Sequence, residues 1–385
     1  MTGHTPGGFM RFHRGVLCTA MFVLASCGAK PGAPSKLTER WDTANDPIHL
    51  LPADYVYLLS SLPLEGSVER KPWSDTYWPS ADGGLAARWQ EGISGHQVTP
   101  VTPSQAVNMS PAQLSLLSPA EKFDIFVGDE SMSLFQSERQ RTHPTDESWF
   151  GICHGWAPAA LLFAEPKAVV VTSPSGLAIP FGASDVKALL SLYTGQFAQT
   201  DTKILASRCN LDISNDPQAA MSPECRDTNA GAFHLVLAKL LGIKKQGFVA
   251  DVTRDRAVWN QPVSSFRSTI ISDQLGRSPG AAIRTVREVV VQTEMFYGVE
   301  VQAQWNSGVA MTRSKTYNYR LEIGVLGEIV GGEWLDDERP DFLWSKSLPE
   351  FVDSSPEAHS GHIQWSQLKT IYDAAVAAEA DAPKP

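Results

Sequence analysis

Helical and extended segments occur in this chain as two successive blocks, and that order limits the folds open to it. Ser118 and Glu121 form a capping box with proline at the first helical position, which predicts a helix through Val127. Further helical patterns occupy residues 157–163, 184–192 and 230–241. Runs typical of strands follow at 247–252, 287–304, 316–325 and 327–334, with a bend expected at Gly298. Helices first and antiparallel strands later indicate an α+β fold.

The N-terminal residues have the order of a lipoprotein signal. A basic stretch, residues 10–14, precedes an apolar run, residues 15–24, that is too short to span a bilayer. Two small residues then stand directly before Cys27, which predicts cleavage there and a lipid on Cys27. An ordinary signal peptide is the alternative. We therefore expect export and lipid anchoring to the cell envelope, at the outer membrane. No other apolar stretch in the sequence is long enough for a membrane helix.

Charge and motif content argue against several classes of site. The chain carries 42 acidic and 32 basic residues, a formal net charge of −10, and it has no basic run. Such a composition argues against a nucleic-acid partner. We find no zinc-type spacing of cysteine and histidine and no glycine-rich phosphate loop, so the sequence predicts neither of these sites.

The five cysteines divide by their surroundings. Cys18 leaves with the signal peptide and Cys27 carries the lipid. Cys209 and Cys225 flank a polar segment rich in Asp, Asn, Ser and Pro, and in an oxidising compartment we expect them to form a disulfide. Cys153 is then the one free thiol.

Cys153 stands in the strongest candidate motif. The segment from Trp149 to Trp156 reads Trp-Phe-Gly-Ile-Cys-His-Gly-Trp, and an apolar helical stretch follows it. A helix N-terminus lowers the pKa of a thiol and offers backbone N–H groups to an oxyanion. Pro158 cannot lie deep inside a helix, so the helix must begin close to Cys153 or after it. A buried structural thiol is the alternative; the unpaired cysteine and the two glycines favour a nucleophile. We interpret the adjacent His154 as structural or substrate-facing.

A general base must come from elsewhere in the chain. His234 ends the segment Asn-Ala-Gly-Ala-Phe-His and precedes an apolar stretch, and Asp251 lies on the strand that follows. These residue types can form a Cys-His-Asp triad, in which the acid fixes the imidazole tautomer. We predict His234 as the base and Asp251 as the acid, with Asp255 or Asp227 as alternatives for the acid.

One further motif carries a resemblance to a known family. The segment Val-Trp-Asn-Gln-Pro-Val at 258–263, with Trp259, Asn260, Gln261 and Pro262 at its centre, resembles the surface peptide of the oomycete cell-wall transglutaminase elicitors. It departs from that peptide at residues 264–265, where the elicitors carry Arg-Gly, and after residue 266. Further segments similar to that family and its bacterial relatives lie at 73–78, 84–89, 117–122, 153–158, 229–234 and 331–334.

The resemblance implies a protein-glutamine γ-glutamyltransferase with a papain-like thiol-enzyme core. Cys153 would form a thioester with a protein glutamine, ammonia would leave, and a lysine or small amine would take the acyl group. Trp149 is then a candidate screen that keeps water from the thioester, whereas Trp156 is expected to pack. No cofactor is required on this reading. The acidic turn at residues 336–338, with Asp341, is a candidate calcium site.

The same residues leave two other functions open. A cysteine peptidase or cell-wall amidase would use the same triad, and a non-enzymatic surface lipoprotein would carry an incidental thiol. For the transglutaminase we expect five parts along the chain: a lipoprotein signal peptide at 1–27, a flexible tether at 28–35, an irregular Trp- and Pro-rich arm at 36–108, a catalytic transglutaminase-like domain at 109–345, and a C-terminal helix with a disordered tail at 346–385.

Overall fold

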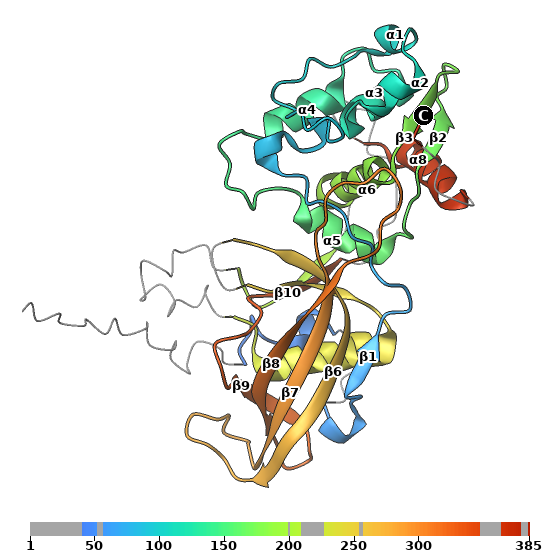
Figure 1. Ribbon diagram of the computed structural model, residues 1–385. Coiled ribbons are helices and arrows are strands. Elements are labelled where there is room, and N and C mark those ends of the chain that lie inside the picture. Colours follow the sequence, from blue (N-terminus) through green and yellow to red (C-terminus); the bar gives the residue numbers. More distant parts are fainter. Residues whose placement is uncertain are drawn as a thin grey trace, which may run out of the picture. The chain divides into compact units, whose positions relative to one another are not determined.

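The computed structural model describes residues 41–51, 57–198, 201–208, 227–253, 257–346, 363–378 and 384–385. All of them belong to one compact unit, Pro34–Pro385. Helices dominate its first half and an antiparallel sheet its second half (Figure 1), so the α+β prediction is confirmed. Among the described residues, no helix combines the length and the apolar character needed to cross a membrane.

The helices at 119–127, 183–192 and 230–244 lie close to their predicted bounds, and the helix predicted at 157–163 begins four residues earlier, at residue 153. The helices at 103–106, 111–115 and 133–141 had no predicted counterpart. Ser118 accepts a hydrogen bond from the Glu121 amide at 3.2 Å, and the Glu121 carboxylate accepts one from the Ser118 amide at 2.9 Å, so the predicted capping box is present. The helices are α1 (Pro103–Ala106), α2 (Pro111–Ser115), α3 (Pro119–Val127), α4 (Ser133–Arg141), α5 (Cys153–Leu162), α6 (Ala183–Leu192), α7 (Ala230–Val236) and α8 (Trp365–Ala377). A π-helical segment, Leu237–Lys244, continues α7.

The strands form one large sheet and one small hairpin. In the large sheet the order is β4-β10-β5-β6-β7-β8-β9, and β1 pairs with β6. Its members are β1 (Glu65–Ser67), β4 (Thr202–Leu205), β5 (Phe248–Asp251), β6 (Asn260–Leu275), β7 (Arg287–Gly298), β8 (Thr312–Ile323), β9 (Ile329–Trp334) and β10 (Leu343–Lys346). The hairpin joins β2 (Val169–Thr172) to β3 (Ala178–Phe181). Sequence patterns predicted β5, β7, β8 and β9 but not β6, although β6 is the longest strand among the described residues.

Helices α5 and α7 pack on opposite faces of the large sheet. Successive side chains of a strand point to opposite faces. Val249 and Trp344 belong to the hydrophobic core that contains α5, whereas their strand neighbours Phe248, Ala250 and Leu343 belong to the core that contains α7. The sheet therefore separates the environment of Cys153 on α5 from that of His234 on α7.

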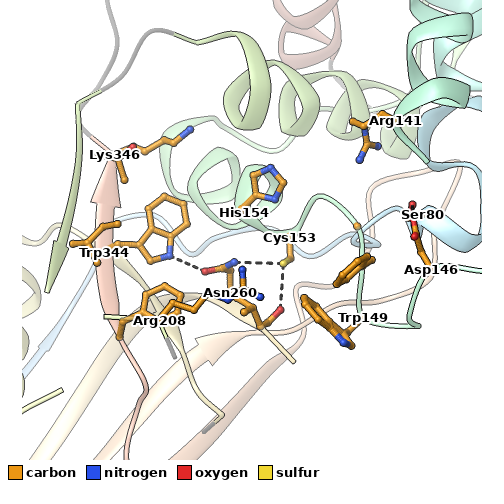
Figure 2. Close-up of a pocket in the computed structure, with 16 residues that line it drawn as sticks. Ser80, Arg141, Asp146, Trp149, Cys153, His154, Arg208, Asn260, Trp344 and Lys346 are labelled. Atoms are coloured by element: carbon orange, nitrogen blue, oxygen red, sulfur yellow. Dashed lines mark hydrogen bonds between the residues drawn. The ribbon is translucent and has the colours of Figure 1, made fainter. Parts of the chain in front are cut away.

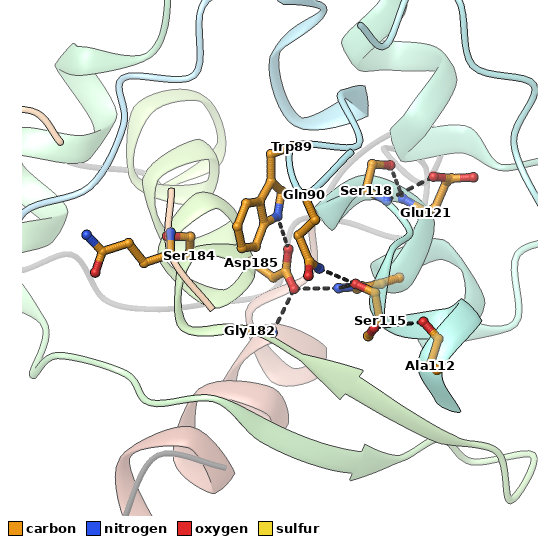
Figure 3. Close-up of polar contacts among 11 residues, drawn as sticks. Trp89, Gln90, Ala112, Ser115, Ser118, Glu121, Gly182, Ser184 and Asp185 are labelled. Atoms are coloured by element: carbon orange, nitrogen blue, oxygen red, sulfur yellow. Dashed lines mark hydrogen bonds and ion pairs between the residues drawn. The ribbon is translucent and has the colours of Figure 1, made fainter. Parts of the chain in front are cut away.

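A buried polar cluster fixes α6, against which α5 packs (Figure 3). The carboxylate of Asp185 accepts hydrogen bonds from the Gly182 amide and from the Trp89 indole, each at 2.7 Å. The ammonium group of Lys122 on α3 lies 2.6 Å from the same carboxylate, and both side chains are fully buried. Because a buried charge is tolerated only when it is paired and hydrogen-bonded, this cluster ties the arm and α3 to the first turn of α6.

Candidate active site

Cys153 is the first residue of α5, which agrees with the expectation that this helix begins close to Cys153 or after it. The preceding loop is held against the arm, since the Ile152 amide donates to the Tyr77 carbonyl at 2.8 Å. A side chain at Gly151 would place its Cβ 2.4 Å from the same carbonyl oxygen. The first-turn amides of an α-helix have no acceptor within the helix. In α5 the Gly155 amide already donates to the Ile152 carbonyl at 2.8 Å. The N–H groups beside the Cys153 sulfur that remain for a ligand oxygen are those of Cys153 and His154.

The start of α5 lies unusually close to α6. A Cβ at Gly155 would lie 2.1 Å from the Ser191 carbonyl oxygen, so only glycine permits this contact. Trp156 is 0% exposed, which agrees with the packing role expected of it. These contacts fix the position of the first turn of α5, and with it the Cys153 sulfur.

Asn260, the first residue of β6, donates a hydrogen bond to the Cys153 sulfur (Figure 2). Its Nδ2 atom lies 3.5 Å from Sγ, and the Val258 carbonyl oxygen lies 3.6 Å from Sγ. The Asn260 Oδ1 atom accepts from the Trp344 indole N–H at 2.7 Å. An indole can only donate, so it fixes which end of the amide is the oxygen. The amide N–H group is consequently held toward the sulfur.

The Cys153 thiol is 6% exposed, and burial raises its pKa above the ordinary value. The side-chain and backbone hydrogen bonds of Asn260 lower this pKa, whereas the negative charges of Glu300 and Asp251 raise it. The expected lowering at a helix N-terminus is therefore outweighed, because removal of the thiolate from water is the larger effect. The resting group is a thiol.

A pocket of about 620 Å³ opens at Cys153. Its walls are largely aromatic and aliphatic, formed by Trp149, Phe150, Ile204, Val258, Phe342 and Trp344. Trp149, the predicted water screen, meets Phe150 edge-to-face with ring centroids 4.2 Å apart, and its indole donates to Glu147 at 2.8 Å. Flat apolar walls of this kind exclude water while admitting the stem of a polar side chain.

His154 also lines this pocket. Its Nε2 atom lies 3.0 Å from the amide nitrogen of Gln196. Burial, assisted by the positive charges of Lys346 and Arg141, lowers the pKa of His154 to about 4. The imidazole is therefore neutral at pH 7.

Comparison with known proteins identifies the family. The sequence model of the transglutaminase elicitors matches residues 128–376. The chain belongs to the transglutaminase elicitor family. The resemblance noted from the sequence is thus confirmed.

A solved structure shares the fold of this elicitor-family chain. The crystal structure of the GP42 transglutaminase from Phytophthora sojae is similar with a TM-score of 0.63 at 21% sequence identity, and the match covers 87% of this chain and 98% of that one. No curated protein shows a significant sequence match.

His234 does not contact Cys153, contrary to the sequence-based hypothesis. Its Nδ1 atom is 2.8 Å from the hydroxyl of Tyr319, and its Nε2 atom is buried with no hydrogen-bond partner. The Tyr319 hydroxyl is hydrogen-bonded to the Thr293 hydroxyl at 2.6 Å, and the Thr293 hydroxyl is hydrogen-bonded to the Ser268 hydroxyl at 2.7 Å. His234 lies far from Cys153 because α7 packs on the face of the sheet opposite α5. His234 is a member of a buried polar chain.

We expect His234 to affect stability through its titration. Burial lowers the pKa of His234 to about 4 from 6.5, so between these pH values the unfolded chain binds a proton that the folded chain does not. Stability is then lost as the pH falls through this window. His234→Asn keeps a polar group near Tyr319 but does not titrate. The fall in melting temperature between pH 7 and pH 5 should therefore be smaller in the variant than in the wild type. A large loss of kcat with an unchanged melting profile would instead restore His234 as a catalytic base.

Asp251, the predicted acid, lies on the same side of the sheet as Asn260, its cross-strand partner. Its Oδ1 atom accepts from the Thr253 amide at 3.1 Å, from the Thr253 hydroxyl at 3.0 Å and from the Trp259 amide at 3.3 Å. These bonds link the end of β5 to residues 253 and 259, the latter directly before Asn260. Of the alternative acids, Asp227 forms a buried ion pair with Arg339, and residue 255 lies outside the described residues.

The family motif occupies the start of β6. Trp259 meets Tyr77 edge-to-face with centroids 5.4 Å apart. Gln261 donates to both carboxylate oxygens of Glu300, at 2.9 and 3.1 Å, and Pro262 pairs with Val249 in the sheet. The sequence marked Asn260 only as part of this motif. No pattern of neighbouring residues indicated that Asn260 contacts the sulfur or that Trp344 orients the Asn260 amide.

The acidic turn proposed for calcium makes other contacts. Asp336 accepts from Asn318 at 2.8 Å, and Glu338 pairs with Lys315 at 2.6 Å. Within the part of the chain that the structure describes, no group of three or more His, Cys, Asp or Glu side chains is placed to hold a metal ion.

Three predicted modification sites fall outside the described residues. They are the lipid anchor at Cys27 and the disulfide partners Cys209 and Cys225. These remain predictions of the sequence.

Proposed function

We propose that this chain is a protein-glutamine γ-glutamyltransferase with Cys153 as its nucleophile. The observation that carries the proposal is the place of the sulfur, which stands at the N-terminus of α5, inside the pocket, 3.5 Å from a fixed amide N–H donor. Family membership supports chemistry of the transglutaminase type. The cysteine peptidase or amidase alternative would also form a thioester on Cys153, with the carbonyl carbon of the bond that it cleaves, and water would resolve that thioester.

In the proposed reaction the Cys153 sulfur attacks the carboxamide carbon of a glutamine side chain. The carbonyl oxygen becomes an oxyanion, which the Asn260 amide and the first-turn N–H groups of α5 would stabilise. The C–N bond breaks, the thiol proton leaves with the nitrogen as ammonia, and a thioester remains. A primary amine then attacks the thioester, forms the new amide and returns a proton to the sulfur.

A proton carrier is required, because the pKa of the Cys153 thiol is raised. With His234 across the sheet, His154 is the histidine among the described residues that lines the pocket. We propose His154 as the carrier in place of His234. With its pKa lowered to about 4, the imidazole is neutral at pH 7 and is a weak proton acceptor.

The test is ammonia release from a glutamine-containing protein, with and without an added primary amine. We expect ammonia release, and we expect a labelled amine to become attached to glutamine. Cleavage of peptide bonds with no amine incorporated would favour the hydrolase. No reaction with any glutamine substrate would favour the non-enzymatic alternative.

Trp149→Ala should alter the fate of the thioester. Water competes with the amine for the acyl group, and the Trp149 ring forms a wall of the pocket. Opening that wall should admit water, so the ratio of deamidated glutamate to amine adduct should rise several-fold. Mass spectrometry of a single-glutamine peptide measures this ratio. Trp149→Phe is the matched control, because it keeps an aromatic wall and should stay close to the wild-type ratio. An equal fall of both products in Trp149→Ala would show that Trp149 acts only in binding.

A further inference from the structure

Three cationic side chains line the Cys153 pocket, and they differ in how their charge is balanced. Arg141 is held by both carboxylate oxygens of Glu138, at 2.8 and 2.7 Å. Arg208 and Lys346 have no ion pair with any described residue. Within the described part of the chain, two of the three charges therefore have no carboxylate partner.

Lys346, at the end of β10, is held by a backbone carbonyl and by no carboxylate of a described residue. Its ammonium group donates to the Thr194 carbonyl, and burial lowers the pKa of the side chain. Arg208 lies over the ring of Trp149, with its guanidinium carbon 5.8 Å from the ring centroid. Figure 2 shows Lys346 and Arg208 on the same side of Cys153, the side on which Trp344 and His154 also lie.

The pocket contains one carboxylate, and it is already engaged. Asp146 accepts from the Ser80 hydroxyl and from the His143 amide, the latter at 3.1 Å. The chain as a whole carries a net charge of −10. A pocket lined by two cations that pair with no described carboxylate, in a chain of this charge, is an electrostatic site for an anionic group.

We propose that the acyl donor is a polypeptide in which an acidic side chain stands next to the reactive glutamine. This inference rests on the proposed transferase function and names its donor class. The donor carboxylate would be attracted by the charges of Lys346 and Arg208, and either side chain could form a charge-assisted hydrogen bond with it. The glutamine methylenes would lie against Trp149 and Trp344, and the carboxamide would reach Cys153. A cationic lysine is repelled from this side, so the same charges separate donor from acceptor.

Donor binding would also act on His154. The positive charge of Lys346 is one of the causes of the lowered pKa of His154. A carboxylate beside Lys346 offsets that charge and raises the pKa of His154 toward its ordinary value. An acidic donor would therefore improve the proton carrier as it binds.

The test uses one peptide scaffold with a single glutamine flanked by glutamate, alanine or lysine. Each is assayed for ammonia release and amine incorporation with the full chain. We expect the wild type to prefer the glutamate peptide over the alanine peptide by roughly tenfold in kcat/KM, as for one good charge-assisted contact, and to use the lysine peptide least. Added salt should reduce the preference.

Two variants and two controls assign the preference to the pocket. Lys346→Gln and Arg208→Gln should each reduce the ratio of glutamate to alanine peptide toward one, whereas Lys346→Arg should retain it. Arg284→Gln removes an exposed charge in the loop between β6 and β7, at the end of β6 opposite Asn260, and should leave the ratio unchanged.

The remaining outcomes of the peptide assay distinguish failure of the acidic-donor proposal from failure of the proposed transferase function. If the wild type uses the glutamate and alanine peptides equally, the acidic-donor proposal is overturned while the transferase stands. If no glutamine peptide reacts, the proposed function itself fails. A neutral peptide ending in glutamine with a free carboxylate provides a further arm. If only that peptide is preferred, the pocket binds the C-terminal carboxylate of its substrate, and the proposal of an acidic side chain next to the glutamine is overturned.

Discussion

Cys153→Ala should abolish both ammonia release and amine incorporation. The thioester requires a sulfur nucleophile, and the structure places one thiol in the pocket. Removal of a nucleophile in an acyl-transfer enzyme costs about 10⁵–10⁶ in kcat, which here means activity near background. Ammonia release and attachment of a labelled amine to a glutamine protein measure the two half-reactions.

Stability separates loss of chemistry from loss of fold in this variant. The Cys153 side chain is small and 6% exposed, so its truncation to alanine should cost about 1 kcal/mol and leave a cooperative unfolding transition. Cys153→Ser is the matched control, because it keeps a polar atom near Asn260 but provides a far weaker nucleophile. A Cys153→Ala protein that still incorporates amine at more than a trace would show that the nucleophile lies elsewhere.

The parts of the site that sequence predicted are those set by local interactions. The capping box of Ser118 and Glu121 acts across three residues, and Pro158 limits the start of α5 to the region of Cys153 or after it. Such features depend on neighbours along the chain, so a single sequence contains them. The short buried strand that carries Asp251 was likewise predicted from residues adjacent in the sequence.

The parts that sequence missed depend on which elements become neighbours in space. A helix pattern gives the apolar side of α7 but does not say which face of the sheet that side will cover, so His234 was assigned to the wrong environment. Trp344 bonds Asn260 only because β10 lies beside β5, and β5 beside β6. That strand order joins residues 84 positions apart. The pKa of Cys153 is raised by burial, and the burial of a side chain depends on the whole fold and not on its neighbours in the sequence.

Asn260→Ala should reduce kcat by about 10²–10³, because removal of one oxyanion donor has a cost of that size. The amide is held toward the reaction centre by the Trp344 indole at 2.7 Å, so the donor is oriented before the substrate binds. The same change should raise the pKa of the Cys153 thiol further, since the hydrogen bonds of Asn260 lower it. The pH midpoint for alkylation of Cys153 should therefore move upward.

Trp344→Phe tests whether the orientation of the amide matters as well as its presence. The substitution keeps an aromatic wall but removes the N–H that holds the Asn260 oxygen. The amide can then rotate, so we expect a smaller loss of kcat than in Asn260→Ala and an upward shift of the alkylation midpoint in the same direction. Trp365→Phe, on α8 and outside the pocket lining, is the matched control and should leave both quantities unchanged. If Asn260→Ala keeps full kcat while alkylation still shifts, the amide tunes the thiol but does not bind the oxyanion. If neither quantity changes, the contact between Asn260 and Cys153 is structural, and the oxyanion must be stabilised by the first turn of α5 alone.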